Sequence, residues 1–148
     1  KLFIKDKKIS IFFKNAYLYP NPPIILGNKL SKYINAAIDT SDGFIGDLEK
    51  ITVVFSKGAK IYTKKLPFSN YSKKLINNKK VLKEDLLTGG EDYQLLFTSN
   101  IKYRHHIVNI SRKLKIKISK IGKINSSKKL IFENFTINKK NKSYIHKI

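Results

Sequence analysis

The chain has 148 residues and a formal net charge of +21, because 31 Lys and Arg side chains stand against 10 Asp and Glu. Its length suits one domain, and an apolar content of 41% is too high for a disordered chain. The lack of cysteine excludes a disulfide framework and thiolate metal sites, and no apolar run is long enough to span a membrane, so we expect a cytoplasmic protein without a membrane partner.

The basic balance first suggests nucleic acid, whose phosphates attract Lys and Arg. Only Arg104 and Arg112 are arginines, however, whereas base reading and bidentate phosphate contact favour arginine. Ile and Asn are also abundant, and these residues, like Lys, are encoded by A- and T-rich codons. We therefore interpret most lysines as a solvated surface and expect no specific nucleic-acid partner, only non-specific binding to polyanions at low salt.

The first 19 residues are rich in lysine and run into Pro20-Asn21-Pro22-Pro23. Prolines this closely spaced are incompatible with a regular helix, so we expect a rigid extended connector. We predict that residues 1–19 are the end of a preceding domain with its connector, and that residues 20–148 form the next domain. Because the chain contains no methionine and begins at Lys1, we expect a processed protein or a piece of a longer one.

Two carboxylates and a hydroxyl follow a short apolar segment in Ala36-Ala37-Ile38-Asp39-Thr40-Ser41-Asp42-Gly43. The apolar pattern predicts a buried strand at residues 36–38 and a helix from residue 43 to about residue 56. Asp39 and Asp42 then lie in a strand-to-helix turn. Such a turn offers backbone N–H groups to anionic oxygens, and carboxylates hold hard cations, so Mg²⁺ together with phosphate is the natural ligand pair.

The alternative interpretation of this turn is that Ser41 or Asp42 only caps the helix, since Ser and Asp are preferred N-cap residues. The distribution of the acids favours a binding role. Eight of the ten acidic residues fall in two short windows, one with Asp39, Asp42, Asp47 and Glu49, and one with Glu84, Asp85, Glu91 and Asp92. A surface so rich in lysine is expected to keep carboxylates mainly where they are needed, and cation coordination is one such need.

The second window contains Gly89-Gly90-Glu91-Asp92-Tyr93. A Gly-Gly pair permits positive φ and close backbone approach, and it brings the two acids to the start of a strand that runs through Phe97. A hairpin or bulge turn with solvated acids is the alternative. Further along, the adjacent His105 and His106 point to different faces of a predicted helix, which argues against a paired metal site.

The other elements are helices and strands in alternation. We expect helices over residues 24–34, 71–82 and 100–114, and Gly58 as the C-terminal cap of the helix that begins at residue 43. We expect strands at residues 59–63, 115–124 and 130–135. Strands separated by helices, with a hairpin near the end, predict a layered α+β fold with a mixed sheet.

Three stretches occur in a characteristic order: Tyr17-Leu18-Tyr19-Pro20-Asn21-Pro22, Ile38-Asp39-Thr40-Ser41-Asp42-Gly43-Phe44 and Gly89-Gly90-Glu91-Asp92-Tyr93-Gln94-Leu95. Together they resemble the C-terminal half of the thiamine-monophosphate kinase family, which belongs to the superfamily of aminoimidazole ribonucleotide synthetase. The resemblance covers roughly residues 16–148. It implies a three-layer α/β/α fold with a mixed β-sheet, like the C-terminal domain of that synthetase.

The resemblance also implies a reaction, in which the γ-phosphoryl group of ATP passes directly to thiamine monophosphate and gives thiamine diphosphate, with several Mg²⁺ ions. By position, Asp39 and Asp42 resemble the family's Mg²⁺ ligands, and Ser41 its contact to ATP. Glu91 resembles its contact to the thiamine end of the substrate, and Tyr144 the aromatic residue against the substrate's ring. No residue is assigned to acid, base or nucleophilic catalysis, because phosphoryl transfer depends mainly on positioning and charge neutralisation.

The family has, in addition, an N-terminal domain that carries further acidic residues and forms a homodimer. This chain lacks that domain, so we expect it to hold half of an active site and to be inactive alone. Two alternatives remain open. One is another ATP-using enzyme of the superfamily, making a purine, selenophosphate or hydrogenase-maturation product, although the Gly-Gly-Glu-Asp-Tyr window counts against it. The other is a basic nucleic-acid-binding module.

Overall fold

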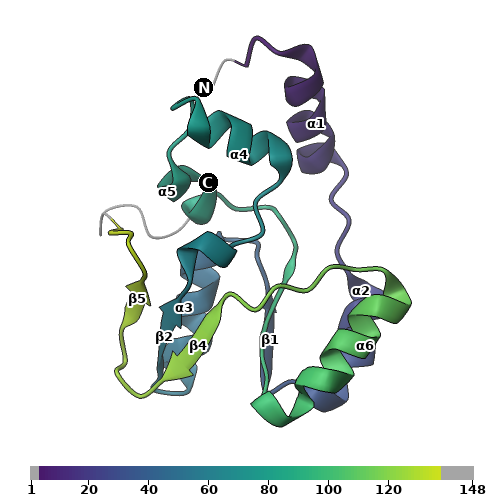
Figure 1. The fold of residues 1–148 in the computed structure, drawn as a ribbon, viewed down its shortest axis with the longest axis vertical. Coiled ribbons are helices and arrows are strands. Elements are labelled where there is room, and N and C mark those ends of the chain that lie inside the picture. The colour runs from purple at the N-terminus through teal and green to yellow at the C-terminus, as the bar shows by residue number, and fades with distance from the viewer. Residues whose placement is uncertain (1–3, 138–148) are drawn as a thin grey trace, which may run out of the picture.

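The computed structural model describes residues 4–137 of the chain (Figure 1). Its α-helices are α1 (Lys7–Leu18), α2 (Ile24–Leu30), α3 (Phe44–Val54), α4 (Asn70–Asn77), α5 (Lys83–Thr88) and α6 (Arg104–Leu114). Its strands are β1 (Ala36–Asp39), β2 (Gly58–Ile61), β3 (Leu95–Thr98), β4 (Gly122–Asn125) and β5 (Leu130–Phe132). Three short 3₁₀ helices complete the list, at η1 (Ser31–Tyr33), η2 (Thr63–Lys65) and η3 (Ile101–Tyr103).

Helix α1 begins at a side-chain cap and ends just before the prolines. The carboxylate of Asp6 accepts hydrogen bonds from the N–H groups of Lys8 and Ile9, at 3.0 and 3.2 Å. These bonds, that from Ile9 foremost, lower the pKa of the Asp6 carboxyl below its ordinary value. Residues 20–23 have no regular structure, which agrees with the predicted connector, while the domain boundary after residue 19 stays a prediction.

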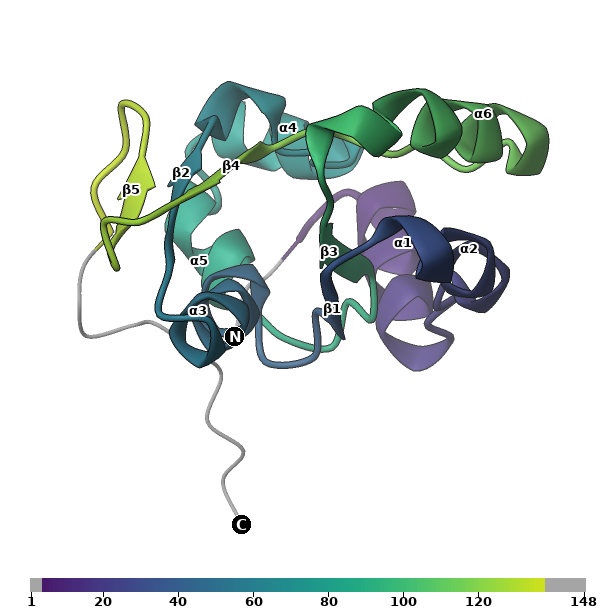
Figure 2. The same cartoon turned by 90° about the horizontal axis from the view of Figure 1, so that it is seen from below.

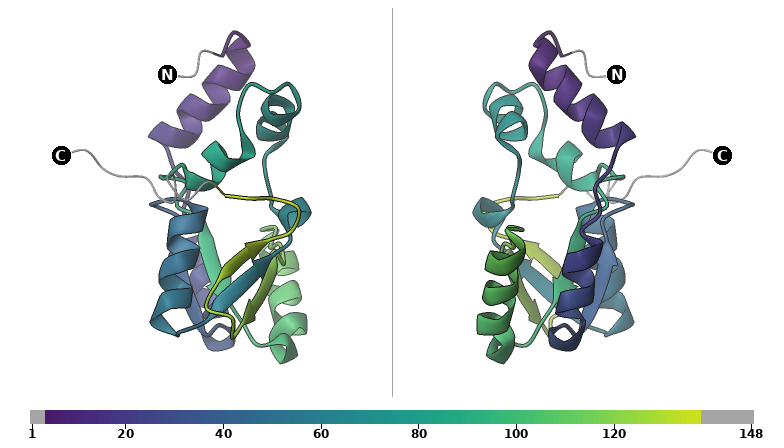
Figure 3. Two further views of the ribbon diagram at one scale, coloured as in Figure 1. Left: turned by 90° about the vertical axis from the view of Figure 1, so that its left-hand side faces the viewer. Right: turned by 90° about the vertical axis from the view of Figure 1, so that its right-hand side faces the viewer.

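The five strands form two small sheets. β1 and β3 pair antiparallel, with Asp39 opposite Leu95, and a separate sheet has the order β4-β2-β5. In the second sheet β2 runs antiparallel to β4 and parallel to β5, so this sheet is mixed, as predicted. The strands lie between α3 on one side and α6 on the other (Figures 2 and 3).

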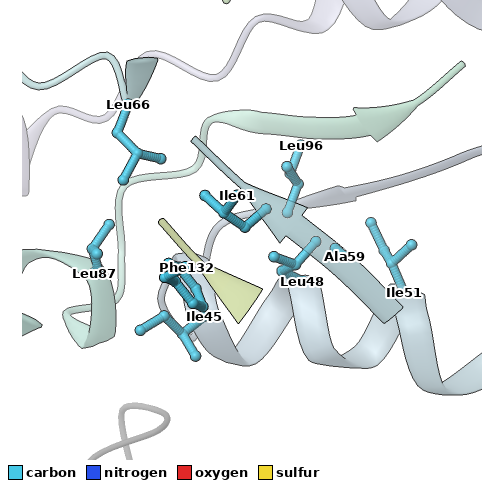
Figure 4. Close-up of a cluster of buried hydrophobic side chains, with 9 residues drawn as sticks. All are labelled: Ile45, Leu48, Ile51, Ala59, Ile61, Leu66, Leu87, Leu96 and Phe132. Atoms are coloured by element: carbon cyan, nitrogen blue, oxygen red, sulfur yellow. The ribbon is translucent and has the colours of Figure 1, made fainter. Parts of the chain in front are cut away.

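The core lies where α3 packs against β2 and β3. Ile45, Leu48 and Ile51 of α3 belong to this core, with Leu48 beside Ala59 of β2 and Ile45 beside Phe132 of β5 (Figure 4). Leu66, Leu87, Leu96 and Phe132 close the cluster from loops and neighbouring elements. Each buried Leu or Ile contributes about 1.5 to 3 kcal/mol relative to exposure, so this cluster fixes α3 firmly on the strands.

The predicted helix at residues 71–82 is interrupted. It corresponds to α4, which ends at Asn77, and α5 follows as a separate helix from Lys83. Lys79 adopts a positive φ of 53°, a conformation that ends a right-handed helix.

The role predicted for Gly58 was wrong. Phe55, not Gly58, caps the C-terminus of α3, and Gly58 opens β2. A Cβ at this position would lie 2.4 Å from the carbonyl oxygen of Lys129, so glycine is required by the close approach of a second backbone.

The predicted strand at residues 115–124 is much shorter than expected. Only β4, from Gly122, belongs to a sheet, and the start of the preceding segment bonds back to α6 at Ile116. The N–H of Ile116 donates to the carbonyl of Ser111, and the Ser111 hydroxyl donates to the carbonyl of Ile116.

In the described residues 4–137, no helix has the length and apolar character needed to cross a bilayer.

Candidate functional site

The candidate site begins at the turn between β1 and α3. Strand β1 ends at Asp39 and α3 begins at Phe44, each one residue later than the sequence predicted. Gly43 adopts a φ of +98°, and a Cβ there would lie 2.7 Å from the carbonyl oxygen of Thr88. Only glycine tolerates both the positive φ and this close approach, so Gly43 lets the turn pack directly against the end of α5.

Three charged side chains fix the turn to the first turns of α3, and we call them the acid–lysine cluster (Asp42, Asp47 and Lys50). The backbone N–H of Asp42 donates to Oδ2 of Asp47 at 3.0 Å. Lys50 Nζ donates to Oδ1 of Asp47 at 2.8 Å and to Oδ2 of Asp42 at 2.5 Å. The Asp47 side chain is 0% exposed, so the cluster is anchored on a fully buried carboxylate.

These contacts raise the pKa of the Lys50 ammonium above its usual range, through the hydrogen bond to Asp42 first and then that to Asp47. Lys50 therefore stays positively charged at neutral pH. The roles of Asp47 and Lys50 were not predicted from the sequence. Their spacing of three residues on a predicted helix was the available signal, since such residues share one helix face.

The two acidic windows of the sequence meet at the turn. The N–H of Glu91 donates to the Ser41 carbonyl at 2.8 Å, and the N–H groups of Asp92 and Tyr93 both donate to the Thr40 carbonyl at 3.1 Å. The N–H of Thr40 donates to the Gln94 carbonyl at 2.9 Å. These bonds continue the β1–β3 ladder beyond its last pair, so residues 91–94 are held against the turn by backbone contacts.

The hydroxyl of Thr40 adds two further contacts between the windows. Its Oγ1 accepts from the N–H of Gln94 at 3.1 Å and lies 3.3 Å from the Gln94 carbonyl, to which it donates. Thr40 itself is buried. A buried hydroxyl with these partners satisfies its hydrogen-bonding capacity and joins two segments that are 54 residues apart.

The glycine pair acts differently from the prediction. Gly89 has a φ of −69°, and the positive φ values of this loop fall on Glu91 (67°) and Tyr93 (48°). Left-handed backbone costs a residue with a Cβ roughly 1 to 2 kcal/mol. The loop keeps this conformation because the hydrogen bonds to the turn hold it, and such strained residues concentrate at functional sites.

The structure brings four of the five predicted site residues into one region. Asp39 is the last residue of β1, Ser41 and Asp42 lie in the turn that follows, and Glu91 lies in the loop bonded to this turn. Tyr144 falls outside the described residues. Asp92, next to Glu91, is exposed as a residue, but partial desolvation of its carboxyl raises its pKa above the ordinary value.

The metal-binding capacity of the site is limited. Within residues 4–137, no three His, Cys, Asp or Glu side chains gather closely enough to form a metal site by themselves. This arrangement fits Mg²⁺ better than a structural metal, because Mg²⁺ is commonly held by one or two carboxylates together with substrate phosphates and water. Asp39 and Asp42 supply two carboxylates in one turn, and Lys50 already contacts one of them.

No family model matches the chain, but known proteins with similar sequences and structures are found. Thiamine-monophosphate kinase of Escherichia coli (strain K12) is 38% identical over 98 residues, which are 66% of this chain and 30% of that protein. The enzyme of Buchnera aphidicola subsp. Acyrthosiphon pisum is 35% identical over 144 residues, covering 89% of this chain and 44% of that protein.

The chain belongs to the thiamine-monophosphate kinase family. It corresponds to the C-terminal part of that kinase and spans between 30% and 44% of the length of these two relatives. The solved structure of AaThiL complexed with AMPPCP and TMP matches with a TM-score of 0.73 at 24% identity, covering 98% of this chain and 44% of that chain. The fold is that of aminoimidazole ribonucleotide synthetase-like proteins, which confirms the predicted fold class.

Proposed function

We propose that the protein containing this chain transfers the γ-phosphoryl group of ATP to thiamine monophosphate and so makes thiamine diphosphate. The observation that carries this proposal is the backbone ladder between residues 40–41 and 91–94, which joins the two acidic windows in one region. The family's relatives are kinases of thiamine monophosphate, and the AaThiL structure holds AMPPCP and TMP.

In this proposal the turn between β1 and α3 binds ATP and its Mg²⁺. Asp39 and Asp42 hold Mg²⁺ through carboxylate oxygens, and Ser41 contacts ATP. The ion, when bound, neutralises charge on the transferring phosphoryl group, which is the main requirement of this chemistry. Asp47 acts as a positioning residue, because its buried carboxylate holds the Asp42 backbone and Lys50.

The loop of the second window binds the other substrate in this proposal. Glu91 contacts the thiamine end of thiamine monophosphate, and Tyr144 lies against its ring. The hydrogen bond from the Glu91 N–H to the Ser41 carbonyl links the loop proposed to bind thiamine monophosphate to the turn proposed to bind ATP. Correct relative placement of donor and acceptor is the second major contribution to phosphoryl transfer, beside charge neutralisation.

We further propose that the protein works in the cytoplasm as a homodimer formed through an N-terminal domain. The relatives extend well beyond the part matched here, which leaves room for that domain. In the family it carries further acidic residues, so the present chain by itself should not turn over substrate.

The test of the kinase is direct. The full-length protein is incubated with ATP, Mg²⁺ and thiamine monophosphate, and thiamine diphosphate is followed by chromatography. Product that requires Mg²⁺ is the expected result. A folded protein that gives no product would contradict the proposal and direct the search to other ATP-using reactions of the superfamily.

The role of Asp42 has its own test. Asp42→Ala should lower turnover by about 10² or more, because a charged group facing the transferring phosphoryl is lost. The thermal unfolding midpoint should change little, since the Asp42 backbone contact to Asp47 remains. Glu133→Ala, which removes an acid that pairs with Lys60 away from the turn, is the matched control and should keep full activity. Turnover near the wild-type value in Asp42→Ala would refute the metal assignment.

A further inference from the structure

The acid–lysine cluster places a positive charge where a metal ion is expected. Lys50 Nζ lies 2.5 Å from Oδ2 of Asp42 and 2.8 Å from Oδ1 of Asp47. Its side chain is 48% exposed and that of Asp42 is 32% exposed, whereas Asp47 is fully buried. Lys50 therefore contacts one fully buried carboxylate, that of Asp47, and one partly exposed carboxylate, that of Asp42.

An ammonium group and a divalent cation compete for the same carboxylate oxygen. Asp39, Asp42 and Asp47 place three carboxylates within nine residues, and like charges at this density oppose one another. Lys50 relieves this repulsion when no metal is bound. A metal ion on Oδ2 of Asp42 would lie close to Nζ of Lys50, so the two cations would repel each other and compete for this oxygen.

We propose that Lys50 is an internal counter-cation of the site, which a divalent cation must displace from Asp42 before binding there. This inference rests on the proposed role of Asp42 as a metal ligand. Asp47 retains the displaced ammonium through its own contact at 2.8 Å, so Lys50 needs to give up one of its two carboxylates. Lys50 is thus a positioning residue that weakens metal binding in the absence of nucleotide.

A consequence follows for the order of binding. Because the protein alone offers few ligands and one of them is occupied, the cation should bind well only when nucleotide phosphates add their oxygens. A cation that enters with the nucleotide displaces Lys50 with the help of those oxygens, and the free protein stays largely metal-free.

The test measures the binding of Mn²⁺ to the full-length protein without nucleotide, with free Mn²⁺ followed by electron paramagnetic resonance. Lys50→Gln removes the charge but keeps a donor for Asp47. It should bind Mn²⁺ about two- to fivefold more tightly than the wild type, which is the range expected when an exposed ion pair is removed. Lys50→Arg keeps the charge and should bind Mn²⁺ as the wild type does.

Lys60→Gln is the matched control for net charge. Lys60 is 51% exposed and pairs with Glu133 at 3.2 Å, away from the turn, so this variant reports the effect of removing one lysine from a very basic protein. In an Asp42→Asn background, Lys50→Gln should no longer change the affinity for Mn²⁺. Equal Mn²⁺ affinity in Lys50→Gln and Lys60→Gln would overturn the inference.

A second measurement covers the case in which Lys50→Gln unfolds. In the wild type, the side-chain ¹⁵N signal of Lys50, identified by its loss in Lys50→Arg, should shift when Mg²⁺ is added. An unchanged signal at saturating Mg²⁺, or no Mn²⁺ binding by any of the proteins, would also overturn the inference. The formation of thiamine diphosphate is assayed separately, so the proposed kinase activity can stand when this inference fails.

Discussion

Gly43 shows how a single residue permits the site to form. Its φ of +98° and its contact with Thr88 exclude any side chain, while Asp42 on one side and Phe44 on the other keep ordinary roles in the turn and the helix. The motif Ser-Asp-Gly is thus a backbone requirement as well as a set of ligands. Asp47 and Lys50 add a second requirement, because they hold the Asp42 carboxylate and backbone in place.

Gly43→Ala should destabilise the protein by about 1 to 2 kcal/mol or more, since a Cβ adds left-handed strain and would lie 2.7 Å from the Thr88 carbonyl oxygen. Urea unfolding of both proteins measures the change. Gly27→Ala is the control, because Gly27 lies inside α2 and a Cβ there meets only Leu95 Cδ2 at 3.9 Å. That variant should be neutral or gain about 0.5 to 1 kcal/mol. Similar stabilities for the two variants would contradict this account of Gly43.

At the scale of elements, the site depends on how β1 and β3 are paired. The antiparallel register that sets Asp39 opposite Leu95 also sets residues 40 and 41 opposite the loop of Glu91. A shift of one residue in this register would turn each side chain to the other face of the sheet. Packing of α3 on the strands through Ile45 and Leu48 prevents such a shift.

Substitutions of Thr40 test whether its hydroxyl stabilises the pairing of these two segments. Thr40→Val should cost about 1 to 3 kcal/mol in urea unfolding, because the Gln94 N–H loses its acceptor in a partly buried position. Thr40→Ser keeps the hydroxyl and should recover most of the loss. In the kinase assay, Thr40→Val should raise KM for thiamine monophosphate more than it lowers kcat, since Glu91 lies on the loosened loop. Equal stability of the valine and serine variants would show that the hydroxyl contributes nothing.

At the scale of the whole molecule, the most prominent property is the formal net charge of +21. A surface hollow is lined by five lysines without an acidic residue among its lining: Lys64, Lys65, Lys73, Lys117 and Lys120. This hollow is separate from the turn that carries Asp39 and Asp42. The sequence interpretation, that the lysines form a solvated surface, predicts that these five attract polyanions no more than other exposed lysines do.

Binding to duplex DNA should therefore be weak and strongly dependent on salt. A protein that neutralises roughly 6 to 10 phosphates loses about 10³ to 10⁵ in affinity between about 50 and 200 mM salt. Replacing Lys117 and Lys120 by Gln should weaken binding as much as replacing Lys79 and Lys80, which are exposed in the segment after α4. A much larger loss at the hollow, or a sequence preference that persists at physiological salt, would contradict the interpretation.

The part of the site that lies within a few residues could be predicted. The apolar segment before Asp39 and the apolar spacing after Gly43 predicted the strand, the turn and α3, and the structure confirms all three. The local sequence pattern gave wrong predictions at Gly58 and at residues 115–121. At these positions a contact with another backbone segment sets the conformation, Lys129 for Gly58 and Ser111 for Ile116. Hydrogen bonds to the turn likewise explain why the positive φ values of the second window fall on Glu91 and Tyr93 and not on Gly89 or Gly90.

The sequence by itself thus determined the alternation of helices and strands and the acids in the turn, because helix and strand periodicity and turn chemistry act over short stretches of chain. Three short motifs carried the family resemblance, and the resemblance implied the three-layer fold. Only the tertiary structure decided that Thr40 bonds to Gln94, 54 residues away, and that Lys50 contacts Asp42. The first contact depends on the register of β1 and β3, and the second on the rotation of α3 over the core. Both are set by the packing of side chains distant in sequence, which no local pattern specifies.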